Sequence, residues 1–183
     1  MMHGPFDLGA VPRIETERLI LRGWRDEDFE PFVSMMADAE VAHFLTRDQR
    51  PQDRAAAWRM LALFVGHWAL RGYGLFVVED KATGAFLGRV GAWRPEDWVG
   101  CELGWGLVRE AWGRGVAHEA ARAAGNWAFA NLSLDRVVSL IHVDNVRSQT
   151  LAKRLGMSPG DATLLAGMPH VIWSIARESW MSR

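Results

Sequence analysis

Apolar residues recur at helical spacing between Asp53 and Leu70, which predicts a helix over that range. The repeating positions are Trp58, Leu61, Phe64, Val65 and Trp68. Beyond this helix the apolar runs become short, at 75–78 and 86–90, and the turn residues 81–84 separate them. Two such runs on either side of a turn predict an antiparallel hairpin.

The rest of the chain continues to alternate between the two kinds of pattern. It predicts strands at 18–22, 99–108, 136–142 and 171–175, the last being one of two short strands after Met157, and helices at 26–37, 116–131 and 146–155. No repeat, low-complexity tract or linker interrupts this order, so we expect one α+β domain with a mixed sheet over 13–183. Residues 1–12 contain two prolines and two glycines and predict a flexible lead-in.

Composition narrows the class of protein further. The 183 residues are 49% hydrophobic and 23% charged, with a formal net charge of −1. That balance is typical of a soluble globular domain and favours neither nucleic acid nor a membrane as a partner. The single cysteine, Cys101, leaves no internal disulfide, and neither a secretory leader nor a long apolar span is evident. We therefore expect a cytoplasmic protein.

A glycine-containing bend carries the first candidate chemistry. Gly113 and Gly115 follow a predicted strand and lead directly into the helix predicted from Val116. Backbone amides at a helix start have no carbonyl partners, so they can bind a phosphate without a lysine. The chain has no Gly-Lys-Ser/Thr loop and no dinucleotide fingerprint after an N-terminal strand. The pattern indicates either a pyrophosphate site or a tight turn that needs glycine for its shape.

Several segments around this bend resemble the GNAT superfamily of N-acetyltransferases, and in particular its RimJ/RimL-like branch. The segments that carry the resemblance are 15–22, Leu103-Gly104-Trp105, the bend with Glu119-Ala120, 144–148 and 154–157. The resemblance covers about 13–180 and implies a GNAT-like domain whose central strands, here 99–108 and 136–142, splay apart. It also implies acetyl-CoA as cosubstrate, with the pantetheine arm between these strands. At the first position of the family's phosphate motif, where the family has glutamine or arginine, this chain has Trp112.

The resemblance assigns most of the cosubstrate contacts to backbone. Pantetheine amides pair with the strand end, and the pyrophosphate rests on the amides of the bend. Arg114 either adds a charged contact to a phosphate or is an ordinary solvated arginine. The expected cofactor-binding residues are Leu107, Val108, Arg109, Gly113, Arg114, Gly115, Val116, Ala117, His118, Asn145 and Ser148.

Three residues are candidates for the catalytic chemistry of acetyl transfer to an amine. Strand alternation places Glu102 on one face with two glycines, so its carboxylate has room to act as a base, or it is a structural glutamate. His142 at the end of a predicted strand is a second base candidate, with a structural role as the alternative. Ser148 is the candidate acid or a helix cap, because Ala152 stands where the family has a tyrosine.

The acceptor side is less defined by sequence. Trp24, Trp93 and Trp98 are the expected substrate-binding residues; further candidates are Phe44, His67, Tyr73 and His170, and core packing is the alternative for each. No metal site is expected, because no carboxylate or histidine set has metal spacing. The resulting hypothesis is an acetyl-CoA-dependent N-acetyltransferase with direct transfer to a primary amine. The alternatives are a non-catalytic acyl-CoA-binding module and a transferase of a longer acyl group; a homodimer and a monomer both stay open.

Overall fold

The computed structural model describes residues 11–183, which form one eight-stranded sheet with helices on both faces. The strands are β1 (Ile14–Glu15), β2 (Leu19–Arg22), β3 (Leu75–Asp80), β4 (Phe86–Trp93), β5 (Glu102–Leu107), β6 (Arg136–His142), β7 (Ser158–Leu165) and β8 (Met168–Ala176). The helices are α1 (Phe29–Ala37), α2 (Ala39–Leu45), α3 (Arg54–Arg71), α4 (Val116–Asn131), α5 (Val146–Arg154) and α6 (Arg177–Met181), with short 3-10 turns η1 (Asp26–Asp28) and η2 (Arg109–Ala111). This arrangement confirms the α+β domain with a mixed, mostly antiparallel sheet. Residues 1–10 of the predicted lead-in lie outside the described range.

Local capping explains where the longest helix begins and ends. The Asp53 side chain accepts a 2.7 Å hydrogen bond from the Ala56 amide, which satisfies a free donor of the first turn of α3. Gly72 ends α3 in the left-handed conformation at φ 71°. The predicted helix at 53–70 is therefore confirmed to within one residue at each end.

The structure departs from the sequence prediction at three places near the site. The helix predicted at 26–37 begins as the 3-10 turn η1. Helix α2 was not predicted, because seven residues show too little periodicity; its N-cap, Asp38, accepts bonds from two backbone amides. The strand predicted at 99–108 is shorter, since residues 99–100 form a bend and the Val108 carbonyl already accepts from Ala111 in η2.

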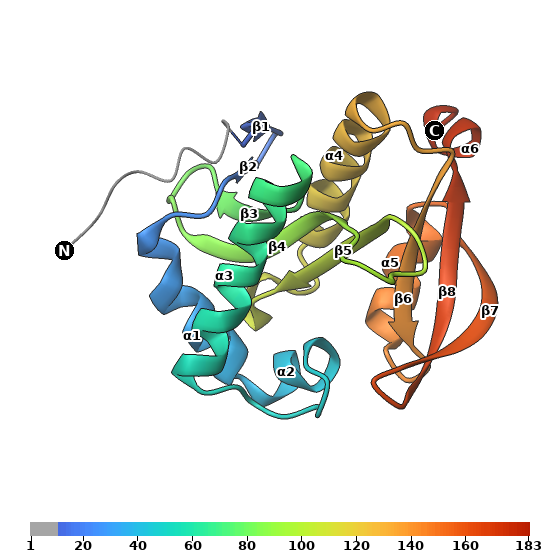
Figure 1. The fold of residues 1–183 in the computed structure, drawn as a ribbon. Coiled ribbons are helices and arrows are strands. Elements are labelled where there is room, and N and C mark those ends of the chain that lie inside the picture. The colour runs from blue at the N-terminus through green and yellow to red at the C-terminus, as the bar shows by residue number, and fades with distance from the viewer. Residues whose placement is uncertain (1–10) are drawn as a thin grey trace.

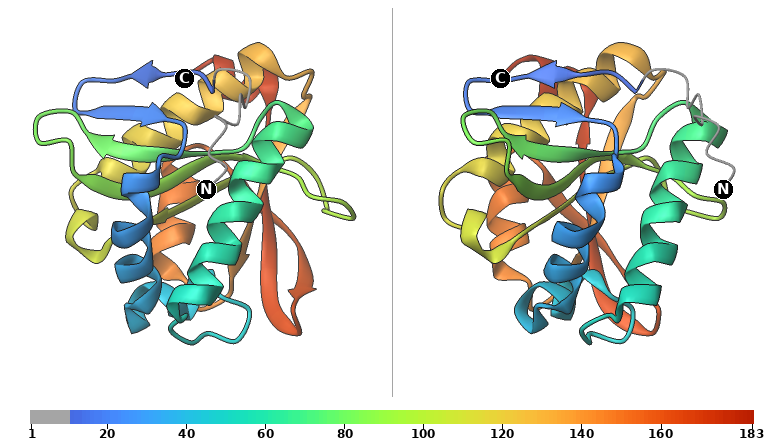
Figure 2. Two further views of the ribbon diagram at one scale, coloured as in Figure 1. Left: turned by 60° about the vertical axis from the view of Figure 1, so that its left-hand side comes forward. Right: turned by 90° about the vertical axis from the view of Figure 1, so that its left-hand side faces the viewer.

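The sheet order is β1-β2-β3-β4-β5-β6-β8-β7, and only the central pair, β5 and β6, is parallel. Figure 2 shows α1 and α3 on one face of the sheet and α4 on the opposite face. Side chains on β4 and β5 divide accordingly: Val90 and Leu103 pack in the core cluster that includes α4, while the Arg89 and Gly106 register pair faces the α1–α3 side.

The two halves of the sheet meet at only one point. Glu102 opposite Val138 is the one register pair between β5 and β6, and the Val138 amide bonds to the Cys101 carbonyl at 3.0 Å. Beyond this point β6 runs with β8 and diverges from β5 (Figure 1). The expectation of splayed central strands is confirmed, and the gap leaves one edge of β5 without a partner among the described strands.

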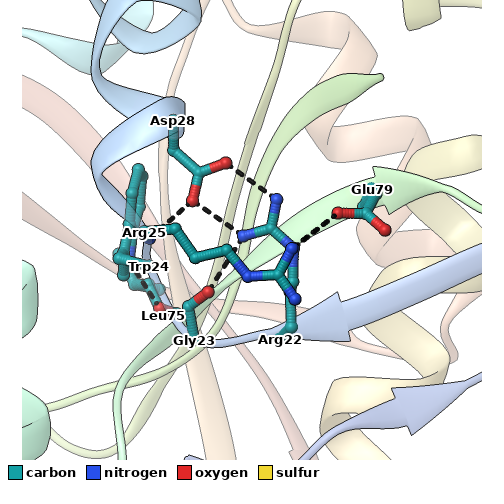
Figure 3. A network of polar contacts seen from close by, with 7 residues as sticks. All are labelled: Arg22, Gly23, Trp24, Arg25, Asp28, Leu75 and Glu79. Carbon is teal, nitrogen blue, oxygen red and sulfur yellow. Dashed lines mark hydrogen bonds and ion pairs between the residues drawn. The ribbon is translucent and has the colours of Figure 1, made fainter. Parts of the chain in front are cut away.

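A buried arginine joins β2 to η1, the turn that leads into α1. Arg22 donates to both carboxylate oxygens of Asp28, at 2.7 and 2.8 Å, and to Glu79 on β3 at 2.5 Å (Figure 3). In the same figure the indole of Trp24 donates a 3.0 Å bond to the Leu75 carbonyl. The Trp24 ring stacks on Phe64, so this tryptophan belongs to the packing between α1, α3 and the sheet.

Among residues 11–183, no helix combines the length and the apolar character that crossing a bilayer requires.

Candidate active site

Two cavities meet beside the gap between β5 and β6. The smaller, of about 360 Å³, is lined by the turn after β5, the start of α4 and the start of α5, and we call it the bend cavity. The larger, of about 770 Å³, is lined by aromatic residues of α2, α3, β4 and β8 and by the mouth of the gap, and we call it the aromatic cavity. They share five lining residues: Phe44, Leu45, Trp105, Asn145 and Ser148.

The glycine bend presents free amides to the bend cavity. Gly113 and Gly115 have φ values of 71° and 79°, a conformation that glycine adopts without strain. The first backbone bond inside α4 runs from the Glu119 amide to the Gly115 carbonyl, so the three amides before Glu119 have no intrahelical acceptor. No atom lies within 4 Å of the position a Cβ would take at Gly113. This geometry suits a phosphate or pyrophosphate group.

An ion pair fixes the bend to the first part of the sheet. The guanidinium of Arg18 donates to Glu119 Oε2 at 2.7 Å and to the Arg114 carbonyl at 3.0 Å. Thr16 donates a 2.6 Å bond to the other Glu119 oxygen. Glu119 was noted in the sequence only as part of the family pattern, and Arg18 was missed as a site residue, because their contact joins segments about a hundred residues apart.

The open edge of β5 lies one residue earlier than the resemblance implies. The Val108 amide bonds to the Leu87 carbonyl on β4, so it points away from the gap. Because bonding directions alternate along an antiparallel pair, the amides of Trp105 and Leu107 face the gap instead. The Leu107 carbonyl accepts a 3.1 Å bond from the Trp112 indole. The amide of Val108, one of the expected cosubstrate contacts, is therefore already paired within the sheet.

Seven of the expected cofactor-binding residues line the bend cavity: Leu107, Gly113, Gly115, Ala117, His118, Asn145 and Ser148. Val108, Arg109, Arg114 and Val116 are not among its lining residues. Arg109 forms ion pairs with Asp38 and Glu40, and Val116 is buried in the core.

The start of α5 separates the roles of two residues that the sequence left ambiguous. Asn145 is the N-cap of α5, because its side chain accepts a 3.1 Å bond from the Ser148 amide. The Ser148 hydroxyl accepts a bond from the Trp105 indole at 3.1 Å, and so its own proton remains available to donate. Ala152, at the position of the family's tyrosine, is fully buried. Ser148 thus places a hydroxyl where the two cavities join.

Glu102 holds a half-buried carboxylate in the lining of the aromatic cavity. Burial raises the pKa of Glu102 to about 7, although hydrogen bonds from Trp98 and the Leu140 amide and the charge of Arg89 favour the ionised form. A pKa close to neutral lets this carboxylate accept a proton under physiological conditions. Its face of β5 continues with Gly104 and Gly106, as the strand alternation predicted.

A backbone amide sets the tautomer of His142, a residue of the aromatic cavity lining. The Asp144 amide lies 3.1 Å from His142 Nδ1, and since an amide can only donate, Nδ1 accepts. The neutral ring then carries its proton on Nε2, which is shielded from solvent and has no partner among residues 11–183. Phe44 and His170 pack edge-on or tilted against the ring. In this tautomer Nε2 carries a proton and cannot act as a base.

A family profile described as an acetyltransferase (GNAT) domain matches residues 18–158. The chain belongs to the GNAT acetyltransferase family. YkkB of Bacillus subtilis (strain 168) is 29% identical over 157 residues, which are 82% of this chain and 87% of YkkB. The acetyltransferase from Agrobacterium tumefaciens str. C58 has a similar structure, with TM-score 0.81 and 28% identity over 92% of this chain and 96% of that one. RimL, a ribosomal L7/L12 alpha-N-protein acetyltransferase solved with coenzyme A, shares the fold at TM-score 0.75 and 15% identity, over 92% and 99% of the two chains.

GNAT acetyltransferases use acetyl-CoA, and the residues of the bend cavity fit that molecule. The open edge of β5 offers unpaired backbone to an extended amide chain, and the glycine bend offers amides to a pyrophosphate. Two arginines that sequence reasoning did not single out, Arg147 and Arg154, also line this cavity and can meet phosphate charge. The guanidinium of Arg147 lies 4.4 Å from the centre of the Trp112 ring.

The expected acceptor residues of the GNAT domain divide into two groups. Trp93, Trp98, Phe44 and His170 line the aromatic cavity. Trp24, His67 and Tyr73 are not among its lining residues: Trp24 packs as described above, and His67 accepts from the Arg94 amide and contacts the Tyr73 carbonyl at 2.7 Å. Arg89, which also lines this cavity, was missed because its role depends on what surrounds it across the sheet.

The described residues give little support for a metal site or for a nucleophilic cysteine. No group of three or more histidine, cysteine or acidic side chains within 11–183 has the geometry to hold a metal ion. Cys101 is buried, and burial raises the pKa of its thiol to about 11. A thiol with so high a pKa is a poor nucleophile at neutral pH.

Proposed function

We propose that the chain transfers the acetyl group of acetyl-CoA to a primary amine, with both substrates bound at once. The single observation that carries this proposal is the meeting of the two cavities at Trp105, Asn145 and Ser148. One cavity has the features of a CoA site and the other holds a carboxylate suited to accept a proton. Motif order and segment 15–22 support placement in the RimJ/RimL-like branch, and we further propose that the protein is cytoplasmic.

In the proposed reaction the cosubstrate supplies an activated acetyl group as a thioester, and residues of the chain move the protons and stabilise the developing charge. Glu102 takes the proton from the ammonium or from the attacking amine, directly or through water. The Leu107 amide, which faces the gap, is the donor placed to polarise the thioester carbonyl. The C–S bond breaks, and Ser148 donates its hydroxyl proton to the departing sulfur while the Trp105 indole holds its oxygen in place. Ser148 then regains a proton from water and Glu102 releases its proton to water, which restores both residues.

His142 and the aromatic residues act on the acceptor in this proposal. Nε2–H of His142 donates a hydrogen bond to a polar group of the acceptor rather than removing a proton. Trp93 and Trp98 form apolar walls, and Trp98 also orients Glu102 through its 2.7 Å hydrogen bond. These walls exclude water, which strengthens the electrostatic effects inside the cavity.

The first test is acetyl-CoA binding by calorimetry, with Gly113→Asp and Gly84→Asp as matched variants. Both glycines have positive φ, at 71° and 74°, and neither has an atom within 4 Å of the position that a Cβ would take, so the two variants carry similar backbone strain. Only Gly113 lines the bend cavity. We expect Gly113→Asp to weaken binding at least about tenfold, through charge repulsion, and Gly84→Asp to bind normally.

The second test is turnover, measured by mass spectrometry over a panel of amines. We expect Glu102→Gln to lower kcat about 10²- to 10⁴-fold without changing the Kd for acetyl-CoA. Acetyl-CoA binding without acetylation of any amine would contradict the enzyme and support a non-catalytic binding module. A strong preference for a longer acyl-CoA would contradict the acetyl assignment alone.

A further inference from the structure

One arginine of the sheet, Arg89, lines the aromatic cavity without a polar partner among residues 11–183. Arg89 lies on β4, with Gly106 opposite it on β5, and the next register pair on that face is Gly91 with Gly104. Leu45 and Met35 fill the space over Gly106, the Gly74 carbonyl fills that over Gly91, and only Gly104 leaves some room beside its backbone. The Arg89 guanidinium lies 4.9 Å from the centre of the Phe64 ring on α3. Arg89 is therefore held under α3, in the lining of the aromatic cavity.

Arg89 has no polar partner within residues 11–183. Its Nε is shielded from solvent and unbonded, and no carboxylate of this range forms an ion pair with its guanidinium. Arg22, two strands away on the same sheet, shows the contrast: it bonds to Asp28 and Glu79 and donates to a backbone carbonyl as well. A shielded arginine whose role is structural is thus fully paired in this protein, and Arg89 is not.

The charge of Arg89 is present at working pH. Burial lowers the pKa of its guanidinium to about 10, which still leaves it protonated at neutral pH. A partly buried charge without a counter-ion is unfavourable, and stacking on one phenyl ring offsets only part of that cost. Such a group is stabilised when a ligand brings an anion to it.

The other charged groups of the aromatic cavity do not supply that anion. Glu102 attracts Arg89 but is engaged with the Trp98 indole and does not form an ion pair with it. Asp48 and Glu96 are exposed at the cavity's rim, and Glu96 is paired with Arg71. The remaining inner lining is largely apolar and includes Met60, Phe64, Leu75 and Trp93.

We propose that Arg89 binds a carboxylate of the acceptor, so that the acceptor is an amino acid: one small molecule that carries both the reacting amine and a carboxylate. The planar guanidinium matches a carboxylate through two parallel N–H···O bonds. Arg47 also lines the cavity but is exposed, so Arg89 is the arginine placed among the apolar residues of the lining. One guanidinium balances the single negative charge of a carboxylate, whereas a phosphate dianion would need more. The cavity volume of about 770 Å³ is in the range of small-molecule sites.

This inference rests on the proposed function and refines its acceptor. Glu102 and Arg89 then act on opposite ends of the same molecule, since Glu102 pairs in register with Trp93, four positions along β4 from Arg89. His142 lines the same cavity, and its Nε2 has no partner within 11–183.

The experiment compares the twenty free amino acids with their α-amides as acceptors, because each amide keeps the amine and lacks the carboxylate charge. The amine of the amide is less basic than that of the acid, so rates are compared per concentration of free-base amine. We expect kcat/KM for the preferred acid to exceed that of its amide about 10- to 100-fold, as one charge-assisted bidentate contact provides. Arg89→Met should raise KM for the acid by a similar factor, leave the amide unchanged and bring the ratio close to one. Arg89→Lys keeps the charge but loses the two parallel N–H donors of the guanidinium, so its acid-to-amide ratio should be intermediate.

Arg136→Met is the matched control, since Arg136 is an exposed strand arginine that lines neither cavity. We expect it to keep the acid-to-amide ratio of the parent. Circular dichroism and acetyl-CoA binding establish that each variant is folded. If Arg89→Met fails to fold, the ratio measured on the parent alone still decides. Amides accepted as well as acids, peptides accepted in preference to both, or equal losses for acid and amide in Arg89→Met would overturn the inference.

Binding of amino acids by calorimetry separates this inference from the proposed function. Binding that Arg89→Met abolishes, in a protein that acetylates nothing, supports the carboxylate site and contradicts the enzyme. Acetylation of amides or peptides with no binding of free acids supports the enzyme and contradicts the carboxylate site. Absence of both binding and turnover contradicts both.

Discussion

The indole of Trp98 donates a 2.7 Å hydrogen bond from Nε1 to Oε2 of Glu102, four residues further along the chain. The bend at residues 99–100 brings the two side chains together just before β5 begins. This bond favours the charged carboxylate and opposes the effect of burial on it. The balance leaves the pKa of Glu102 at about 7, which links a loop tryptophan to the pH at which the site can work.

Replacing Trp98 with phenylalanine should move the acidic limb of the pH–rate profile upward. The bond stabilises the ionised form of Glu102, so its loss raises the pKa and a higher pH is needed to deprotonate the base. We expect the midpoint of log kcat/KM to rise by about one pH unit, and the rate at pH 7 to fall severalfold. Trp58→Phe, on an exposed part of α3, should leave the profile unchanged. A downward shift in Trp98→Phe would contradict this account.

Replacing Ser148 with alanine should lower kcat without weakening acetyl-CoA binding. The hydroxyl is the proposed proton donor, while the cap of α5 comes from the side chain of Asn145 and stays in place. We expect kcat to fall about 10- to 100-fold and the Kd for acetyl-CoA to stay within about twofold. The loss of kcat is limited because water can replace the hydroxyl as the proton donor. Ser34→Ala on α1, whose hydroxyl bonds only to the Glu30 carbonyl, is the control. A large loss of helicity or of CoA affinity in Ser148→Ala would instead indicate a structural role.

Replacing Glu119 with glutamine should loosen the glycine bend in a pH-dependent way. Burial alone would raise the pKa of Glu119, but hydrogen bonds from Thr16 and Arg18 hold it below its usual value. Its ionised form therefore stabilises the fold above the ordinary carboxyl pKa, and this stability is lost as the pH falls. We expect Glu119→Gln to lose about 1–2 kcal/mol at pH 7 and to bind acetyl-CoA more weakly.

The measurement for Glu119 is denaturant unfolding of parent and variant at pH 7 and near pH 4. The difference in unfolding free energy should shrink at the lower pH, because there the unfolded parent binds a proton at Glu119 more readily than the folded parent, whose Glu119 pKa is lowered. A difference that stays constant across this range would show that the charge of Glu119 does not contribute.

Replacing Arg22 with methionine should test the buried network of Figure 3. The substitution leaves the buried carboxylate of Asp28 without its bidentate partner, and we expect a loss of about 3–5 kcal/mol in unfolding free energy. Arg54→Met removes another bidentate pair, with Glu30, on the exposed surface, and should change stability little. Similar losses in both variants would contradict the importance of burial.

Local pattern was sufficient for much of this protein. Helix α4 and strand β6 begin and end as predicted, and α3 differs by one residue at each end, because periodicity and capping residues act over short distances. The glycine bend and the splayed strands were likewise expected from contiguous segments and from the resemblance that they carry. The hydroxyl of Ser148 and the face occupied by Glu102 follow from the same local spacing.

What only the tertiary structure decided depends on contacts between distant segments. The pairing of β5 with β4 turned the Val108 amide away from the gap and assigned the open edge to Trp105 and Leu107. The Arg18–Glu119 ion pair, the tautomer of His142 and the lack of a polar partner for Arg89 in the described part of the chain are also invisible along the sequence. A residue's type and spacing determine what it can do, but its charge state and its free donors depend on which neighbours the fold brings to it.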